Sequence, residues 1–540
     1  MTAVAEASPA LPRTGSTHPF AGTGTLLRLA LRQDRLMIPA WVIVLSLVTV
    51  SGAGTIEGLY DTAAKRAELA QSMVTNGSLR AMYGPVFGDS LGGLVAWRFG
   101  GFIAVTAAVM SLLIVVRHTR EEEETGRQEM LSSAAVGRRA PLTAAMLAAL
   151  VANAGVALII TLGLGGPTGS TTGALALGLA IAGIGMLFAG MAGIMAQLTE
   201  SARLARGLTA ATLGTAYALR AAGDASASDG GSVWTWLSPL GWAENVRPYA
   251  GERWWVLLML GAAVLVQGSV AYVLAGRRDV GMSFLPTRPG PAEGRITTAA
   301  GLALRLQRGT LIGWTAGFFV AGVVFGGMAE GAADLVGENE GAKEIFERMG
   351  GQTGLTDAFL AAITGLCGLV AALYAVSSVL RLHGEETSQR AEPILANAVG
   401  RVGWAAGHLT IAFGGTAVIM TAAGAGLAIG HGQDAGRLLG AALVLLPAVW
   451  LLAGLAFLLY GLLPKLATAA WGVVGLCLAI GWIGPALDLP EGVLNLSPFS
   501  HLPKMPGDGM SWPPALILTA LAAALVSAGL TALRRRDLHS

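Results

Sequence analysis

Two short charged segments carry the residue types in this chain that could form ion pairs with another protein. Each contains two adjacent glutamates, an arginine, a further glutamate, a short apolar stretch and a Gly-Arg dipeptide. These residues are Glu123, Glu124, Arg127, Glu129 and Arg138 in the first segment and Glu385, Glu386, Arg390, Glu392 and Arg401 in the second. Their chemistry is charge pairing at a surface, so the sequence predicts a docking site rather than a catalytic one. The other interpretation is a solvated polar face, the usual role of a run of charges.

The spacing within each segment predicts its local structure. A glutamate four residues before an arginine stabilises an exposed helix by ~0.2–0.5 kcal/mol. The pairs at this spacing are Glu123 with Arg127 and Glu386 with Arg390. Pro393 suits the first position of a helix, and glycine suits the position after its end, so we expect short helices at 130–136 and 393–399. A helix of this length hardly forms alone, but it can form when a partner provides a groove.

The two charged segments belong to a duplication that extends over most of the chain. Four short patterns of the first half return in the same order in the second. They are Leu29-Ala30-Leu31-Arg32 with Leu302-Ala303-Leu304-Arg305, the charged segments themselves, Ser238-Pro239 with Ser497-Pro498, and Arg277-Arg278-Asp279 with Arg535-Arg536-Asp537. In this alignment Glu123 corresponds to Glu385, and the offset rises from 262 to 263 within the loop because one residue is inserted.

Composition indicates a membrane protein. Charged residues make up 13% of the chain and hydrophobic residues 54%, and the 76 glycines lie within apolar stretches, as is typical of close helix packing in lipid. The net charge of +2 is too small to indicate a nucleic-acid partner. Cys367 and Cys477 match no zinc spacing and the seven histidines are scattered, so we expect no metal or catalytic site. No Gly-x-x-x-x-Gly-Lys-Ser/Thr phosphate loop occurs.

Twelve apolar segments predict an all-α polytopic membrane protein built as two tandem six-helix halves. Lipid admits only helices or closed barrels, and continuous apolar runs indicate helices. The segment at 142–162 would be about 31 Å long as a helix, which matches a hydrocarbon core of ~30 Å. The first half, over 25–276, has segments at 36–53, 99–116, 142–162, 173–197, 204–219 and 255–276. The second half, over 301–540, has segments at 310–327, 359–380, 404–428, 438–460, 468–486 and 514–533.

The remaining regions are expected on one side of the membrane. Residues 1–24 predict a flexible cytoplasmic tail, and residues 277–300 predict a cytoplasmic linker. Leucines and arginines are mixed at helical spacing in 26–35 and again near 301–308, which predicts amphipathic helices along the membrane surface. Positive-inside charge at the edge of a span is the other interpretation. Most of the 35 Lys and Arg residues fall on the side of the N-terminus, so the positive-inside rule places both termini in the cytoplasm.

The first charged loop resembles that of a known transporter family. Its pattern, Glu-Glu-x-Gly-x-x-Glu-x-Leu and then Gly-Arg between the second and third spans, is similar to the coupling-helix loop of type-2 ABC exporter permeases. Ser-Pro-Leu-Gly-Trp … Val-Arg-Pro-Tyr at 238–249 and Arg-Arg-Asp-Val-Gly … Pro-x-Arg-Pro-Gly-Pro at 277–291 resemble actinobacterial polyketide-antibiotic exporter permeases. The resemblance covers nearly all residues after 25. The second copy departs from it with Ser388-Gln389, where glycine is usual.

The resemblance implies a function and its partners. The chain would be a plasma-membrane permease without an ATPase of its own, powered by two cytosolic ABC ATPase subunits that hold ATP and Mg. The ten charged residues of the two loops would contact those subunits. The cargo would be an antibiotic or another hydrophobic or amphipathic small molecule.

In that family the substrate route runs between the second and fifth spans of each half. Aromatic rings, methionine and hydroxyl groups there would suit an amphipathic, ring-bearing ligand. The residues of these types are Phe99, Phe102, Met110, Thr209, Thr212, Tyr217, Phe359, Tyr374, Trp471 and Trp482. Ordinary helix packing or lipid contact is the alternative role for each of them.

A proton-coupled secondary drug antiporter with twelve spans is the main alternative function. Such carriers couple through ionisable groups inside the membrane, each of which costs at least ~2.5–3.5 kcal/mol to place there. The predicted span centres contain no Asp or Glu, so the sequence favours energy delivered by a bound protein. A membrane-embedded enzyme would need convergent acids, histidines or metal ligands, which the sequence does not contain.

Overall fold

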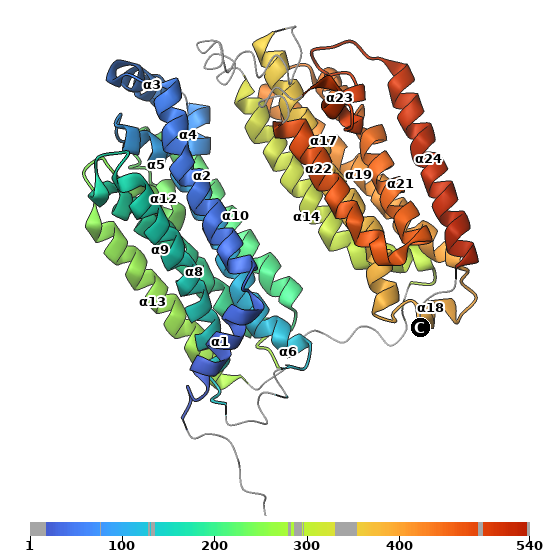
Figure 1. The fold of residues 1–540 in the computed structure, drawn as a ribbon, viewed down its shortest axis with the longest axis horizontal. Coiled ribbons are helices and arrows are strands. Elements are labelled where there is room, and N and C mark those ends of the chain that lie inside the picture. The colour runs from blue at the N-terminus through green and yellow to red at the C-terminus, as the bar shows by residue number, and fades with distance from the viewer. Residues whose placement is uncertain are drawn as a thin grey trace, which may run out of the picture. The chain divides into compact units, whose positions relative to one another are not determined.

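The computed structural model describes residues 18–75, 77–127, 130, 136–278, 282–285, 294, 296–329, 354–483 and 490–536. The chain divides into two compact units, Met1–Pro289 (unit 1) and Gly290–Ser540 (unit 2), and each is described by itself. Every regular element of the described residues is a helix, which confirms the all-α prediction (Figure 1). The boundary between the units falls inside the expected linker at 277–300.

Unit 1 contains long apolar helices and several short ones at their two ends. These are α1 (Thr23–Gln33), α2 (Met37–Leu59), α3 (Ala63–Thr75), α4 (Gly77–Tyr83), α5 (Leu91–Val116), the π-helix η1 (Arg117–Glu121), α6 (Glu122–Glu124), α8 (Ala140–Gly165), α9 (Thr171–Leu198), α10 (Ala202–Ser226), α11 (Val233–Leu237), α12 (Pro239–Asn245) and α13 (Trp254–Arg277). The side chains of Ser90 and Ser170 cap α5 and α9 by accepting bonds from Gly93 and Gly173. We call the end with α6 the loop end and the opposite end, with α3 and α4, the cap end (Figure 1).

Unit 2 also contains long apolar helices, but the short helices that connect them differ from those of unit 1. These are α14 (Ala299–Gly327), α17 (Leu355–Thr387), α18 (Glu392–Leu395), α19 (Arg401–His431), α20 (Ala435–Leu443), α21 (Leu446–Leu462), the 3₁₀-helix η2 (Pro464–Ala469), α22 (Ala470–Ile483), α23 (Glu491–Leu494), η3 (Pro498–His501) and α24 (Trp512–Arg535). In this unit the loop end carries α18 and the cap end carries α23 (Figure 1).

Eleven helices of the described residues are long and apolar enough to cross a membrane, which fits a polytopic membrane protein. Each of the twelve predicted segments overlaps at least one helix of the described residues, but the segment at 204–219 is not among the eleven. Its helix, α10, carries Arg203, Arg206, Arg220 and Asp224, and these charges lower its apolar character.

The helices predicted at the start of each half differ from one another. In unit 1, α1 is a separate amphipathic helix that packs on the core through Leu27, Ala30 and Leu31. The segment near 301–308 is not separate, because α14 runs without a break from Ala299 through the first span of unit 2. The duplicated sequence therefore folds in two ways at this point.

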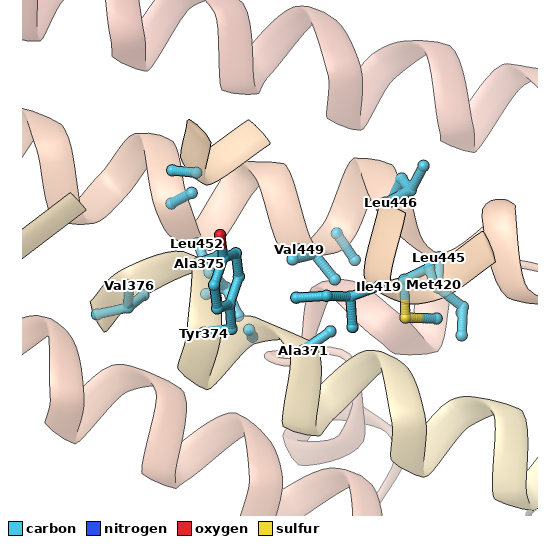
Figure 2. Close-up of a cluster of buried hydrophobic side chains, with 14 of the residues drawn as sticks. Ala371, Tyr374, Ala375, Val376, Ile419, Met420, Leu445, Leu446, Val449 and Leu452 are labelled. Atoms are coloured by element: carbon cyan, nitrogen blue, oxygen red, sulfur yellow. The ribbon is translucent and has the colours of Figure 1, made fainter. Parts of the chain in front are cut away.

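Small residues bring the helices of unit 2 into close contact. A Cβ atom on Gly426 would lie 2.2 Å from the backbone oxygen of Phe319, and one on Gly430 would lie 2.1 Å from that of Val323. Helices α14 and α19 therefore touch backbone to backbone, as small residues permit in lipid. Beside them, Tyr374 is buried in a cluster with Ile419 and other apolar side chains (Figure 2).

Candidate functional site

The loop end of unit 1 contains a buried ion-pair cluster around Glu123. Arg278, just after α13, approaches this carboxylate with both guanidinium nitrogens, Nη1 at 2.8 Å from Oε2 and Nη2 at 2.5 Å from Oε1. Arg120 pairs with the same carboxylate. The Nε atom of Arg278 also donates to Oε1 of Gln197 on α9, at 2.9 Å. The side chains of Arg120, Glu123 and Arg278 are all more than 90% buried, so these contacts tie the ends of α5, α9 and α13 together.

The loop end of unit 2 contains the equivalent cluster around Glu386. Arg536, just after α24, places Nη2 2.6 Å from Oε2 of Glu386. The hydroxyl of Tyr460 on α21 donates to the same oxygen at 2.6 Å, and the ring of Tyr460 lies 4.8 Å from the guanidinium of Arg536. The ends of α17, α21 and α24 are thus joined as those of α5, α9 and α13 are in unit 1.

The third member of each cluster is the arginine of the Gly-Arg dipeptide. Arg138 donates to the backbone oxygen of Arg278, and Arg401 donates to that of Arg536. Arg278 and Arg536 therefore bind the glutamate through their side chains and hold the end of the loop through their backbone oxygens. We call Glu123, Arg278 and Arg138, and likewise Glu386, Arg536 and Arg401, the two loop locks.

The locks correct the alignment of the two loops. Glu123 matches Glu386 rather than Glu385, and the offset is 263 throughout, without an inserted residue. The turn after the helix confirms this register. Gly126 has φ +70° and Gln389 has φ +57°, and each donates its N–H to the carbonyl of the lock glutamate, at 3.0 and 2.9 Å. A glutamine thus occupies a left-handed position that favours glycine.

The predicted pairs Glu123–Arg127 and Glu386–Arg390 are wrong by one residue. Arg127 instead places Nε 2.8 Å from Oε2 of Glu122, and Arg390 places Nε 3.3 Å from Oε2 of Glu385. The reason is that the helix ends before each arginine, so four-residue helical spacing no longer applies. Both arginines are more than half exposed, which leaves them accessible at the loop surface.

The remaining loop residues form the exposed surface. In unit 1, Glu124 is exposed and its Oε1 accepts the N–H of Ala202 at 2.9 Å, which caps α10. In unit 2, α18 covers only Glu392–Leu395, shorter than the predicted 393–399. Glu392 and Pro393 face outward, whereas Ile394 and Leu395 pack on the core. Glu129 and most of the predicted helix at 130–136 lie outside the described residues.

The N-terminal segment differs from the flexible tail expected over 1–24, because its last residues are held in place. The backbone N–H groups of Gly137 and Arg139 donate to the carbonyls of Ala21 and Pro19, each at 2.9 Å. A Cβ atom on Gly137 would lie 2.4 Å from the Pro19 carbonyl, so the close approach requires glycine. At the equivalent Gly400 the space is open.

The residues expected along a substrate route lie in several environments. Tyr374 and Trp471 line one cavity of about 230 Å³ in unit 2, together with Gln307, Thr310, Ser377, Ser378, Leu380 and Arg381. The side chains of Phe359, Met110 and Thr209 are buried in their own units. That of Phe102 is exposed, and those of Phe99, Thr212 and Tyr217 are half-buried. Trp482 is on α22, but its side chain is not described.

The sequence contains a signal for Arg278 and Arg536. Both lie in the duplicated Arg-Arg-Asp motif, which the sequence presents as part of the repeat and which the fold brings to the lock glutamates. No repeated motif points to Arg120, Gln197 or Tyr460. These residues contact the lock of one unit only, and the other unit has different residues at that place.

Comparison with known proteins identifies the family. Residues 296–534 match the family model described as multidrug efflux system permease Rv1217c, C-terminal domain. The chain is 44% identical over 539 residues to the multidrug efflux system permease protein Rv1217c of Mycobacterium tuberculosis (strain ATCC 25618 / H37Rv). The match covers 98% of this chain and 97% of that protein. The chain with two loop locks is therefore a membrane permease of the Rv1217c multidrug efflux family.

Proposed function

We propose that this chain is the membrane-spanning subunit of an ATP-driven exporter of the type-2 ABC kind, without an ATPase of its own. Two cytosolic ABC ATPase subunits, which hold the ATP and Mg, dock on the loop ends of the two units. The observation that carries this proposal is the repeated loop lock, because each lock presents a charged, exposed turn on a rigid base. The cargo is a hydrophobic or amphipathic small molecule such as an antibiotic.

The locks suggest how movement of a partner would reach the spans. A partner that binds the exposed residues around Arg127 or Glu392 and then moves displaces the loop. The loop lock connects this loop to two or three helix ends. Through Arg278 the displacement reaches α13 and α9, and through Arg536 it reaches α24. Nucleotide-bound partners then have to favour the outward-open state by ~5.5 kcal/mol to shift its population from 1:99 to 99:1.

The orientation follows from this function. The loop ends and both termini are cytoplasmic, and the cap ends face outward. The test uses single cysteines in a chain whose own two cysteines, Cys367 and Cys477, are buried. In intact cells, a membrane-impermeant maleimide labels Ala64→Cys at the cap end and does not label Thr125→Cys at the loop end. The reverse pattern would contradict the orientation.

The docking role is tested by charge reversal. Glu129→Lys together with Glu392→Lys abolishes co-purification of the ATPase subunits and stops efflux. Asp89→Lys, which changes an exposed acid at the cap end, is the matched control and leaves both unchanged. Full partner recovery with the double variant would refute docking at these loops.

A proton-coupled antiporter remains the second candidate. In the candidate spans of the described residues, every Asp and Glu lies near a helix end, as Glu57, Asp357 and Glu386 do. An acid at a helix end near the surface is poorly placed to carry protons through the lipid core. This distribution favours the ATP-driven function.

A further inference from the structure

The cap end of unit 1 contains a buried charged cluster that the loop locks do not involve. One nitrogen of Arg220, Nη1, lies 2.8 Å from Oε1 of Glu244 and 3.6 Å from Oδ2 of Asp224. The side chains of Arg220, Asp224 and Glu244 are 2%, 0% and 12% exposed. Arg220 and Asp224 lie on α10, and Glu244 lies on α12, outside the candidate spans.

Two arginines join α4 and α10 reciprocally around this cluster. Nη2 of Arg220 donates to the backbone oxygens of Ala81 and Met82 at the end of α4, at 2.9 and 3.0 Å. Arg80 of α4 donates from Nε and Nη2 to the backbone oxygens of Asp224 and Ala225, at 3.0 and 2.9 Å. Each arginine satisfies carbonyls that the end of the other helix leaves free. The guanidinium groups are thus held in place independently of the acids.

The two carboxyl groups are left with one unsatisfied oxygen each. Oδ1 of Asp224 accepts from the hydroxyl of Thr235 at 2.8 Å, and Oε1 of Glu244 accepts from Arg220. When both groups are charged, neither Oδ2 of Asp224 nor Oε2 of Glu244 has a donor among the described residues, and both atoms are buried. The two carboxyl groups are within hydrogen-bond reach of each other, so a proton on one makes it a donor to the other and satisfies both.

We propose that Asp224 and Glu244 share one proton, and that this proton-binding site fastens α12 to α10 at the cap end of unit 1. The titratable or charged groups that face the pair are Arg80, Arg220 and Tyr217, whose ring lies 4.6 Å from the Arg220 guanidinium. One shared proton leaves a single negative charge opposite Arg220, whereas its loss leaves two adjacent buried carboxylates, an unfavourable arrangement.

The direction of the pKa shifts agrees with this geometry. Burial raises the pKa of Asp224, and burial together with the Asp224 carboxyl raises the pKa of Glu244 to about 8, although the charge of Arg220 opposes both shifts. A carboxyl whose folded pKa exceeds its unfolded pKa binds its proton more tightly in the folded protein. Its contribution to stability is therefore full below the unfolded pKa of 4.5 and is lost as the pH rises towards about 8.

The site also forms part of a pocket wall. Glu244 lines a cleft in unit 1 with Tyr83, Phe87, Trp97 and Ile181. A neutral Glu244 keeps this aromatic wall free of charge, and loss of the proton places a carboxylate in it. The proton thus controls both the attachment of α12 and the polarity of the cleft, independently of how transport is powered.

The test compares the full-length protein with Glu244→Gln in detergent from pH 5 to pH 9. The glutamine keeps an oxygen for Arg220 and supplies N–H donors to Asp224, so it imitates the protonated state. The wild-type infrared spectrum contains the C=O band of a protonated carboxyl group at pH 6, and this band disappears as the pH passes about 8. The variant lacks the band at every pH. The thermal midpoint of the wild type also falls more steeply with pH than that of the variant, up to about pH 8.

Two further variants serve as an independent test of the pair and as a control. Asp224→Asn removes the partner carboxyl that helps to raise the pKa of Glu244, so the band disappears at a lower pH than in the wild type, and this holds even if Glu244→Gln fails to fold. Asp357→Asn in unit 2 removes an acid that pairs with Arg437 at 2.9 Å and leaves the band unchanged. A wild-type spectrum without a titrating band, or an identical band in Glu244→Gln and the wild type, would overturn the proposal. Neither result depends on ATP-driven export.

Discussion

The guanidinium of Arg278 and the carboxylate of Glu123 form a two-point contact, with Nη1 2.8 Å from Oε2, that joins the residue after α13 to the end of α5. Arg536 and Glu386 form a one-point contact at the equivalent place in unit 2, with Nη2 2.6 Å from Oε2. Removing one member of a buried ion pair leaves the other without its counter-charge, which costs several kcal/mol. Each lock therefore stabilises its own unit as well as setting the base of the charged turn.

Replacing the lock glutamate of unit 2 destabilises the protein. Glu386→Gln leaves the buried guanidinium of Arg536 without its counter-charge and lowers the free energy of unfolding by about 3 kcal/mol. Asp434→Asn is the matched control, because this carboxylate is 57% exposed and its pair with Arg437 lies at the surface, and its cost stays below about 1 kcal/mol. Thermal unfolding of the two purified variants measures the difference. Equal effects would show that the lock adds no stability.

The turn residue of the second loop is strained. Gln389→Gly removes a side chain from a left-handed position with φ +57° and raises stability by about 1 kcal/mol. Gly126→Ala, at the equivalent turn with φ +70° and open space around it, lowers stability by a similar amount. Thermal unfolding measures both changes. If the two substitutions shift stability in the same direction, the 263-residue register is wrong.

The two glycines of the Gly-Arg dipeptides respond differently to the same substitution. Gly137→Ala forces the Pro19 backbone away, because its Cβ would lie 2.4 Å from the Pro19 carbonyl, and this breaks the hydrogen bond from the Arg139 N–H and speeds amide exchange at residues 137–139. Gly400→Ala has open space and leaves amide exchange unchanged. Hydrogen–deuterium exchange of the peptides that contain residues 137–139 measures the effect. Protection of the Arg139 amide that survives Gly137→Ala would contradict the contact.

The helices could be predicted from the sequence because apolar runs long enough to cross lipid have few alternatives to a helix. The continuity of residues 301–308 with the following span could not be predicted from the sequence. The duplicated Leu-Ala-Leu-Arg pattern lies in a separate helix, α1, in unit 1 and in a continuous helix, α14, in unit 2. The sequence alignment of the two loops is wrong by one residue, because Glu122, Glu123 and Glu124 cannot be told apart by residue type. Only the partner, Arg278, distinguishes the lock glutamate from its neighbours.

The residues predicted for the substrate route do not all line one cavity, because the packing of the helices decides which side chains meet. Tyr374 and Trp471 are far apart in sequence, and their cavity depends on how α17 and α22 pack. Phe102, on α5, has the same aromatic character, yet its side chain is 68% exposed. Residue type and span number predict which helices contribute to a route, but the rotation of each helix decides which side chains line it.

Shortening an aromatic side chain in the unit 2 cavity changes transport. Trp471→Ala enlarges the cavity and raises the concentration for half-maximal efflux of a ring-bearing substrate about tenfold or more, because burying such a ring contributes about 1.5–3 kcal/mol. Phe102→Ala, which alters an exposed ring outside this cavity, is the control and leaves that concentration unchanged. Dye efflux from cells that express each variant measures the effect. Equal responses would remove this cavity from the route.

Transport in reconstituted vesicles measures the energy source of efflux most directly. The chain is inserted with its ATPase partners, and uptake of a fluorescent amphipathic drug into inside-out vesicles is followed with ATP and Mg, and then without nucleotide. The account predicts that uptake requires ATP and the partners, and that it continues when the proton gradient is collapsed. Uptake that proceeds without nucleotide and stops when the proton gradient is collapsed would contradict it.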